Sequence, residues 1–263
     1  MHKIKSDNKM DAITLTFGDC MENHAGMQKV GEMSSNGFSF EDLDNVRKFF
    51  KDLGAETKLY NLNKLLSEED QALVNDVAYF LIVKNGINFL KEGLSEDLYQ
   101  EHAVLEYDKH YYDARRNKVL NKLARWNLCF DDICQEADYA NKKGTIVSYD
   151  DVPYTKVLKE KIGSLVGDTD LKLEANYYYD LKKTGIGYHG DSERRKVVGV
   201  RLGKNNPMAF KWFKNSEHIG KKFETVLSDG DIYIMSEKTV GTDWKRRSII
   251  TLRHAAGAKK YTN

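Results

Sequence analysis

Two kinds of hydrophobic spacing divide the chain. Up to about residue 112, apolar residues recur every three or four positions, which is the spacing of one buried helix face. The clearest run begins after Ser39, a predicted N-cap with an acidic residue three positions on, and ends at Gly54. Further helices are predicted after Ser67 and, less regularly, over residues 95–112. We therefore expect residues 1–112 to form a mainly helical N-terminal region, whose role the sequence does not assign.

From residue 171 onward, short runs rich in β-branched and aromatic residues alternate with Gly, Asn, Asp and Lys. The runs are LKLEANYYYDL, KVVGVRLG, MAFKWF, KKFETVL, GDIYIMS and RSIITLRHA. Short strands at this spacing are typical of a β-sandwich or jelly roll and not of a parallel sheet. One helix, YTKVLKEKIGSLVG, precedes them. The predicted fold class is α+β, with a second domain over residues 113–263.

Composition narrows the classes of protein. The 263 residues carry 41 Lys and Arg against 40 Asp and Glu, and a net charge of +1 excludes a uniformly basic nucleic-acid binder but not a local basic patch. No apolar run approaches the roughly 18 residues that cross a bilayer, and the first residues lack the apolar core of a signal peptide. We expect an intracellular protein, cytoplasmic or nuclear, without a membrane partner. Its cysteines, Cys20, Cys129 and Cys134, are expected to be reduced thiols.

The motif with the clearest chemistry is His189-Gly190-Asp191. It places an imidazole and a carboxylate two residues apart, on the same side of an extended strand end. With a third ligand from a distant strand, such a pair forms the two-histidine, one-carboxylate triad of non-heme iron(II) oxygenases, which leaves positions open for a cosubstrate and oxygen.

Around this motif, the sequence resembles the AlkB family of iron(II)- and 2-oxoglutarate-dependent dioxygenases, over about residues 115–255. Asn176-Tyr177-Tyr178 is similar to the family's Asn-x-Tyr strand, Tyr188-His189-Gly190-Asp191 to its metal motif, and the run RSIITLR to its Arg-x-Asn-x-Thr-x-Arg strand. The resemblance implies a double-stranded β-helix (jelly roll), catalysis at His189 and Asp191, and Fe(II) with 2-oxoglutarate as cosubstrate. The residues implied to bind the cosubstrate are Asn176, Tyr178, Arg247 and Arg253. Both arginines would share the inward face of one strand, where a guanidinium can bind a carboxylate through two parallel hydrogen bonds.

The third metal ligand departs from the family's pattern. The family has a histidine shortly after a tryptophan at this point, whereas here Lys245 and Arg246 follow Trp244. We expect Asp243 to be the third metal ligand, with Glu237 or a site of only two protein ligands as alternatives. His254 is a poor substitute by this reasoning, because on an extended strand it should point away from Arg253.

The family's substrate lid corresponds to residues 113–130, DARRNKVLNKLARWNLCF. Basic residues that can neutralise phosphates surround Trp126, which can stack on a base; they are Arg115, Arg116, Lys118, Lys122 and Arg125. Arg125, Trp126 and Glu193 are therefore the candidate substrate-binding residues, and a base in a single strand or flipped from a duplex is the expected substrate. An amphipathic helix is the alternative for this segment. Alternatives for the function are a dioxygenase acting on a protein or small molecule, and a catalytically inactive AlkB-like binding module.

Overall fold

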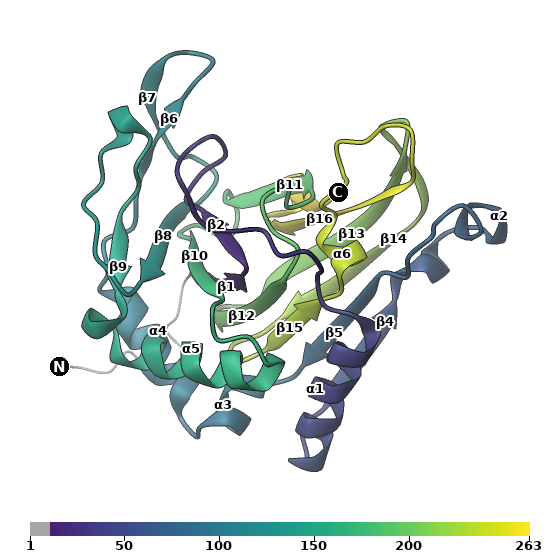
Figure 1. Cartoon of the computed structure of the whole chain (residues 1–263), viewed down its shortest axis with the longest axis horizontal. Helices are drawn as coiled ribbons and strands as arrows, with labels where there is room; N and C mark the ends of the chain where they lie inside the picture. The colour runs from purple at the N-terminus through teal and green to yellow at the C-terminus, as the bar shows by residue number, and fades with distance from the viewer. Residues whose placement is uncertain (1–10) are drawn as a thin grey trace.

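The computed structural model describes residues 11–263 (Figure 1). The first ten residues of the expected helical region, which also contributed to the signal-peptide argument, lie outside the described residues. The strands are β1 (Ala12–Gly18), β2 (Cys20–Glu22), β3 (Lys29–Gly31), β4 (Thr57–Asn61), β5 (Tyr79–Val83), β6 (His110–Asp113), β7 (Lys118–Asn121), β8 (Trp126–Asp131), β9 (Ile146–Ser148), β10 (Lys172–Tyr178), β11 (Gly185–His189), β12 (Val197–Gly203), β13 (Asn206–Lys214), β14 (Glu217–Leu227), β15 (Ile232–Met235) and β16 (Thr251–Gly257). The helices are α1 (Phe40–Asp52), α2 (Glu68–Gln71), α3 (Gly86–Leu90), α4 (Leu94–Ala103), α5 (Pro153–Val166), α6 (Glu237–Val240) and α7 (Lys259–Thr262), with 3₁₀ turns η2 (Leu62–Leu65), η3 (Tyr139–Asn141) and η4 (Tyr149–Asp151).

The fold is mixed α+β and rich in sheet, which confirms the predicted class. An eight-stranded sheet has the order β4-β5-β15-β12-β1-β10-β8-β9, and a four-stranded sheet has the order β11-β16-β13-β14. All neighbouring strands pair antiparallel except β8 and β9. Two hairpins, β2–β3 and β6–β7, rise on the same side of the large sheet (Figure 1).

Strand β1 lies at the centre of the large sheet although it is the first strand of residues 11–263. It pairs with β10 on one side and β12 on the other, so that Thr14 is opposite both Asn176 and Arg201. Apolar and polar side chains alternate strictly along β1. Ile13, Leu15 and Phe17 are buried on one face of the strand, and Thr14 and Thr16 lie on the other. One face of the sheet is therefore apolar, while the central strands make the opposite face polar.

Helices cover the apolar face. The core on this side joins β1, β10 and β12 to α1, α3, α4 and α5, and its members on these helices are Leu43, Val46, Phe50, Ile87, Leu94, Leu98, Tyr99, Leu158 and Ile162. A second core packs the outer part of the large sheet against the four-stranded sheet. Trp212 on β13 is fully buried in this second core, and its indole N–H donates to the Leu62 carbonyl at 2.9 Å. The two sheets are thus held face to face, with their polar central strands left to line a cavity.

The helix expected after Ser39 forms as predicted. The Ser39 side chain caps the backbone N–H of Asp42, and the Asp42 carboxylate accepts from the Ser39 N–H, which is a complete capping box. The helix expected after Ser67 is shorter, since α2 ends at Gln71 and the apolar run from Phe80 onward belongs to β5. The N-terminal region therefore mixes helices with strands, and β1, β4 and β5 belong to the same sheet as strands from after residue 113.

Residues 113–130 do not form the alternative amphipathic helix. They form the end of β6, all of β7 and most of β8, and β8 pairs with β10 in the large sheet. Over residues 11–263, no helix combines the length and the apolar character required to cross a bilayer.

Candidate metal centre

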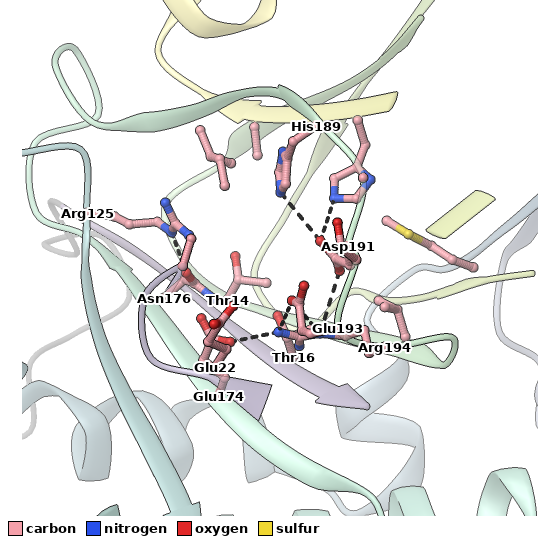
Figure 2. A pocket seen from close by; sticks show the side chains of 18 of the residues that line it. Thr14, Thr16, Glu22, Arg125, Glu174, Asn176, His189, Asp191, Glu193 and Arg194 are labelled. Atoms are coloured by element: carbon pink, nitrogen blue, oxygen red, sulfur yellow. Dashed lines mark hydrogen bonds and ion pairs between the residues drawn. The ribbon is translucent and has the colours of Figure 1, made fainter. Parts of the chain in front are cut away.

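Three side chains from the four-stranded sheet and the turn beside it converge on one point. The Nε2 atom of His189 lies 3.5 Å from Oδ1 of Asp191, and the Nε2 atom of His254 lies 3.6 Å from the same oxygen. One ligand atom from each of the three residues fits within 4.8 Å of the others. Figure 2 shows His189 and Asp191 pointing toward each other, and both line the cavity. The arrangement can hold a single metal ion on two imidazoles and one carboxylate.

Strand pairing explains how residues far apart in the sequence meet. His189 at the end of β11 is the register partner of His254 on β16, so both rings project from neighbouring positions on one face. Asp191 follows two residues later, in the turn after β11. Between them, Gly190 lies against residue 241, where an added Cβ would be 2.0 Å from the Gly241 carbonyl oxygen. Any larger residue at position 190 would push this turn away from the rest of the cluster.

The hydrogen bonding of His189 leaves one nitrogen free for a metal. Its Nδ1 atom lies 2.8 Å from the Gly187 carbonyl oxygen, and because a carbonyl can only accept, Nδ1 must carry the proton. In the neutral imidazole, Nε2 is then the nitrogen with a free lone pair, and it faces Asp191. Such a bond to the far nitrogen fixes both the tautomer and the orientation of a metal-binding imidazole.

Electrostatics keep the cluster in a form that can bind a metal. Burial opposes ionisation of Asp191, but the neighbouring imidazoles and the Arg194 guanidinium outweigh it and hold the pKa of this carboxyl well below its usual range. Burial lowers the pKa of His254, and the nearby His189 lowers it further. An ionised carboxylate and a neutral imidazole are the protonation states that metal ligands require.

Arg194 links Asp191 to a wider buried network. Its Nη2 atom lies 2.9 Å from Oε2 of Glu174 and 2.9 Å from Oε1 of Glu193, and its Nε atom lies 3.8 Å from Oδ2 of Asp191. The Arg194 side chain is 5 % exposed. One guanidinium thus forms ion pairs with three carboxylates of the site, as Figure 2 shows.

The cluster lies in the wall of a cavity of about 450 Å³ between the two sheets. Among the residues predicted from the sequence, those that line this cavity are Arg125, Asn176, Tyr178, His189, Asp191 and Glu193. Arg125 donates to the side-chain oxygen of Asn176, and both lie at the same side of the cavity in Figure 2. Apolar side chains such as Val197, Met208 and Met235 complete the lining.

Asp243 does not lie at the cluster, contrary to the expectation. Its carboxylate accepts a hydrogen bond from Nζ of Lys238 at 2.6 Å, and the third group beside His189 and Asp191 is His254. The alternative ligand Glu237 accepts instead from the Gly37 N–H and from Arg195. His254 was set aside because Arg253 was assumed to point inward; on β16 the two residues do alternate, but His254 is the one that faces the cavity.

The two arginines expected to bind the cosubstrate lie outside the cavity lining. Arg247 is exposed in the turn before β16, so the predicted strand over residues 247–253 begins only at Thr251. The Arg253 guanidinium packs on aromatic rings, with its Cζ 4.1 Å from the ring centre of Phe213 and 5.4 Å from that of Trp244. The assumed common inward face was therefore wrong for this pair.

Two residues of the expected lid have structural partners. Trp126 lies outside the cavity lining and stacks on Tyr179, with ring centres 4.2 Å apart and Nζ of Lys109 over its face. Lys122 is 5 % exposed and donates to Asn23 and Asn127, so it is not available to a phosphate. The exposed basic residues of this segment, Arg115, Arg116 and Lys118, lie on the β6–β7 hairpin instead.

Arg201 is a buried charged residue of the cavity that sequence reasoning missed. Arg201 on β12 is 1 % exposed and lines the same cavity as the cluster. The signal was present in the run VVGVRLG, where Arg201 interrupts apolar residues and shares a strand face with Gly199 and not with Val198, Val200 or Leu202.

No protein-family model matches the chain. A curated protein of Acanthamoeba polyphaga mimivirus, named "Uncharacterized protein R156", is 42 % identical over 251 residues, which covers 95 % of this chain and 97 % of that protein. This name states no activity. The chain belongs to the same family as this mimivirus protein.

Proposed function

We propose that the protein is an iron(II)- and 2-oxoglutarate-dependent dioxygenase of the AlkB type. The observation that carries the proposal is the His189, Asp191 and His254 cluster, which faces a cavity large enough for a small cosubstrate. Two histidines and one carboxylate are the donor set that non-heme iron(II) oxygenases use. Donor atoms about 2 Å from one ion and at right angles to each other lie roughly 3 Å apart, which is close to the 3.5 and 3.6 Å separations here.

The order of the strands supports a double-stranded β-helix. From β10 to β13, successive strands alternate between the large and the small sheet, β14 stays in the small one, and β15 and β16 alternate again. The central strands β10-β1-β12-β15 then face β11-β16-β13-β14. Eight strands in two such sheets match a jelly roll. In this proposal the eighth strand of the roll is β1, which the beginning of the described chain supplies.

The surroundings of the cluster also fit this chemistry. When bound, the iron with its cosubstrate supplies the oxidising power for hydroxylating a carbon–hydrogen bond. The protein's own residues hold the ligands in place: the Gly187 carbonyl orients His189, and Arg194 stabilises the charge on Asp191. Val197, Met208 and Met235 exclude water from one wall, which strengthens electrostatic interactions inside the cavity.

The proposed substrate is a modified base in nucleic acid. Arg115, Arg116 and Lys118 are exposed on the β6–β7 hairpin, which rises beside the β2–β3 hairpin (Figure 1). His24, between β2 and β3, lines the cavity, and its ring stacks on Tyr111 of β6 with centres 3.7 Å apart. The basic hairpin is thus in contact with the cavity rim, where its cations can bind phosphates near a base that enters the cavity.

The ligand assignment is tested by anaerobic titration with Fe(II) or Mn(II). His189→Ala and His254→Gln should each weaken metal binding by at least tenfold, because each removes a ligand, and glutamine keeps much of the volume at position 254. Asp243→Asn is the matched control and should bind the metal like the wild type, since its carboxylate contacts Lys238. If Asp243→Asn loses the metal while His254→Gln retains it, the assignment is wrong. A wild-type protein that binds neither metal would contradict the proposed function and favour a binding module.

A further inference from the structure

Arg201 is a buried guanidinium that points into the cavity. It lies on β12, and β1 brings Thr14 between it and Asn176 of β10, so that one residue from each of three adjacent strands forms a row across the sheet. All three residues line the cavity. Arg201 is 1 % exposed, Thr14 is 4 % exposed and Asn176 is 9 % exposed. The row is therefore part of the closed end of the cavity and not of its rim.

This guanidinium forms no salt bridge among residues 11–263, and the carboxylate of Asp231 attracts it only from farther away. Its Nε and Nη1 atoms are buried and donate no hydrogen bond, and the hydroxyl oxygen of Thr14 is also buried without a bond. The Asp231 carboxylate is engaged elsewhere, by Lys84 and by the backbone N–H groups of Asn85 and Ser228. On another side, the ring centre of Tyr178 lies 5.7 Å from Cζ of Arg201.

A buried charge without a hydrogen-bonded partner is costly in free energy, and buried charges in proteins are normally paired. The other arginine deep in the cavity, Arg194, differs because it already binds Glu174 and Glu193. Arginine presents two parallel N–H groups that match a carboxylate. In Arg201 the unfilled Nε and Nη1 atoms lie on different edges of the guanidinium, and each forms such a parallel pair with Nη2, so a planar anion inside the cavity can bind at one of these edges.

We infer that Arg201, with the Thr14 hydroxyl beside it, binds the carboxylate of the 2-oxo acid cosubstrate that lies away from the metal. This inference rests on the proposed function. It assigns the carboxylate to a different arginine from Arg247 and Arg253, the two that the resemblance to the AlkB family implied. It gives the cavity a selection rule: 2-oxo acids with a second carboxylate bind, and those that end in a methyl group bind weakly.

The test compares 2-oxoglutarate with 2-oxopentanoate, which has the same chain length and lacks the second carboxylate. Binding is measured anaerobically with Mn(II) by calorimetry and by the rise in unfolding temperature. The wild type should prefer 2-oxoglutarate by at least about 30-fold, since truncating one partner of a buried charge pair commonly costs that much or more. Arg201→Gln should lose this preference, Arg201→Lys should keep part of it, and Arg247→Gln is the matched control, because its side chain is exposed.

Two further readouts separate the outcomes. Mn(II) binding should be the same in Arg201→Gln and the wild type. If the wild type fails to bind Mn(II), the proposed function is contradicted. If Arg201→Gln binds 2-oxoglutarate as tightly as the wild type does, only this inference is overturned. Without ligands, Arg201→Gln should unfold at the same temperature as the wild type or higher, because it removes an unpartnered charge; a large drop would mark Arg201 as structural and count against the inference. If Arg201→Gln fails to fold, Thr14→Val must weaken 2-oxoglutarate binding for the inference to stand. Equal competition by inorganic phosphate would assign the arginine to a phosphate of the substrate and overturn the assignment.

Discussion

Acid should destabilise this protein through His102, a histidine far from the metal cluster. His102 lies on α4 and is 1 % exposed, and both ring nitrogens have partners: Nδ1 is 2.9 Å from the Tyr107 hydroxyl, and Nε2 is 2.9 Å from Oγ1 of Thr155. The Thr155 hydroxyl donates to Glu101 at 2.6 Å, so its oxygen accepts from Nε2–H of His102. Nδ1 is then left to accept from Tyr107. The imidazole is neutral in the folded protein.

The size of the effect follows from the pKa difference between the folded and unfolded states. Burial lowers the pKa of His102 from 6.5 to about 3. Above pH 6.5 the residue is neutral in both states and has no effect on the pH dependence. Below that value the unfolded chain binds a proton that the folded protein does not bind until about pH 3, so stability falls as the pH falls. One such group costs about 1.4 kcal/mol per pH unit, or about 2.7 kcal/mol at pH 4.5, out of a total that is typically about 5–15 kcal/mol.

The assay is urea unfolding of the wild type and His102→Gln at several pH values between 7.5 and roughly 4.5. Glutamine does not titrate, so the other ionisable groups cancel when the two curves are subtracted. The variant should be less stable than the wild type at pH 7, and this gap should shrink by about 2–3 kcal/mol at the acid end. Two parallel curves would show that His102 takes up a proton equally in both states and would refute the reasoning.

Two other substitutions test the cavity and the basic hairpin. In Gly199→Ala, the new Cβ would lie 1.9 Å from the ring of Tyr233. We therefore expect the free energy of unfolding to fall by about 1–3 kcal/mol in urea unfolding and 2-oxoglutarate binding to weaken in calorimetry. If both values are unchanged, the Tyr233 ring moves aside freely. Replacing Arg115 and Arg116 with Ala should weaken binding to single-stranded oligonucleotides and reduce the slope of log affinity against log salt by about 1.4, whereas Lys122→Ala, the internal control, should cost about 1–3 kcal/mol of stability without changing the slope. Equal slopes in the arginine variant and the wild type would favour a protein or small-molecule substrate.

Local pattern predicted the parts of the site that are close in sequence. The spacing of His189 and Asp191 was sufficient to pair them, because the turn after β11 holds residues two positions apart on one side. The helices α1 and α5 also follow from local signals, a capping box in one and Pro153 at the start of the other. Such features depend on neighbours within a few residues, which a single sequence displays.

The rest of the site depends on pairing between distant strands, which a single sequence does not display. His254 was misjudged because its orientation was argued from Arg253, and the inward face of β16 is fixed by pairing with β11 and β13. Lys122 looked like a surface cation until the contacts of its amino group with Asn23 and Asn127 showed it to be internal. The alternation of β1 marks a strand, but nothing in it indicates that its partners are β10 and β12.

The central place of β1 has a consequence for synthesis on the ribosome. Ala12 pairs with Tyr178 and also with Gly203, so the strand leaves the ribosome long before either partner has been made. Contacts this distant in sequence slow folding, because a long loop must close, at a cost in entropy, before the stabilising contacts can form. Until then the apolar residues Ile13, Leu15 and Phe17 stay exposed on an unpaired strand, which is a hazard for aggregation. We expect β1 to need a chaperone while it waits for its partners, and we expect the cavity to form only after β12 has emerged.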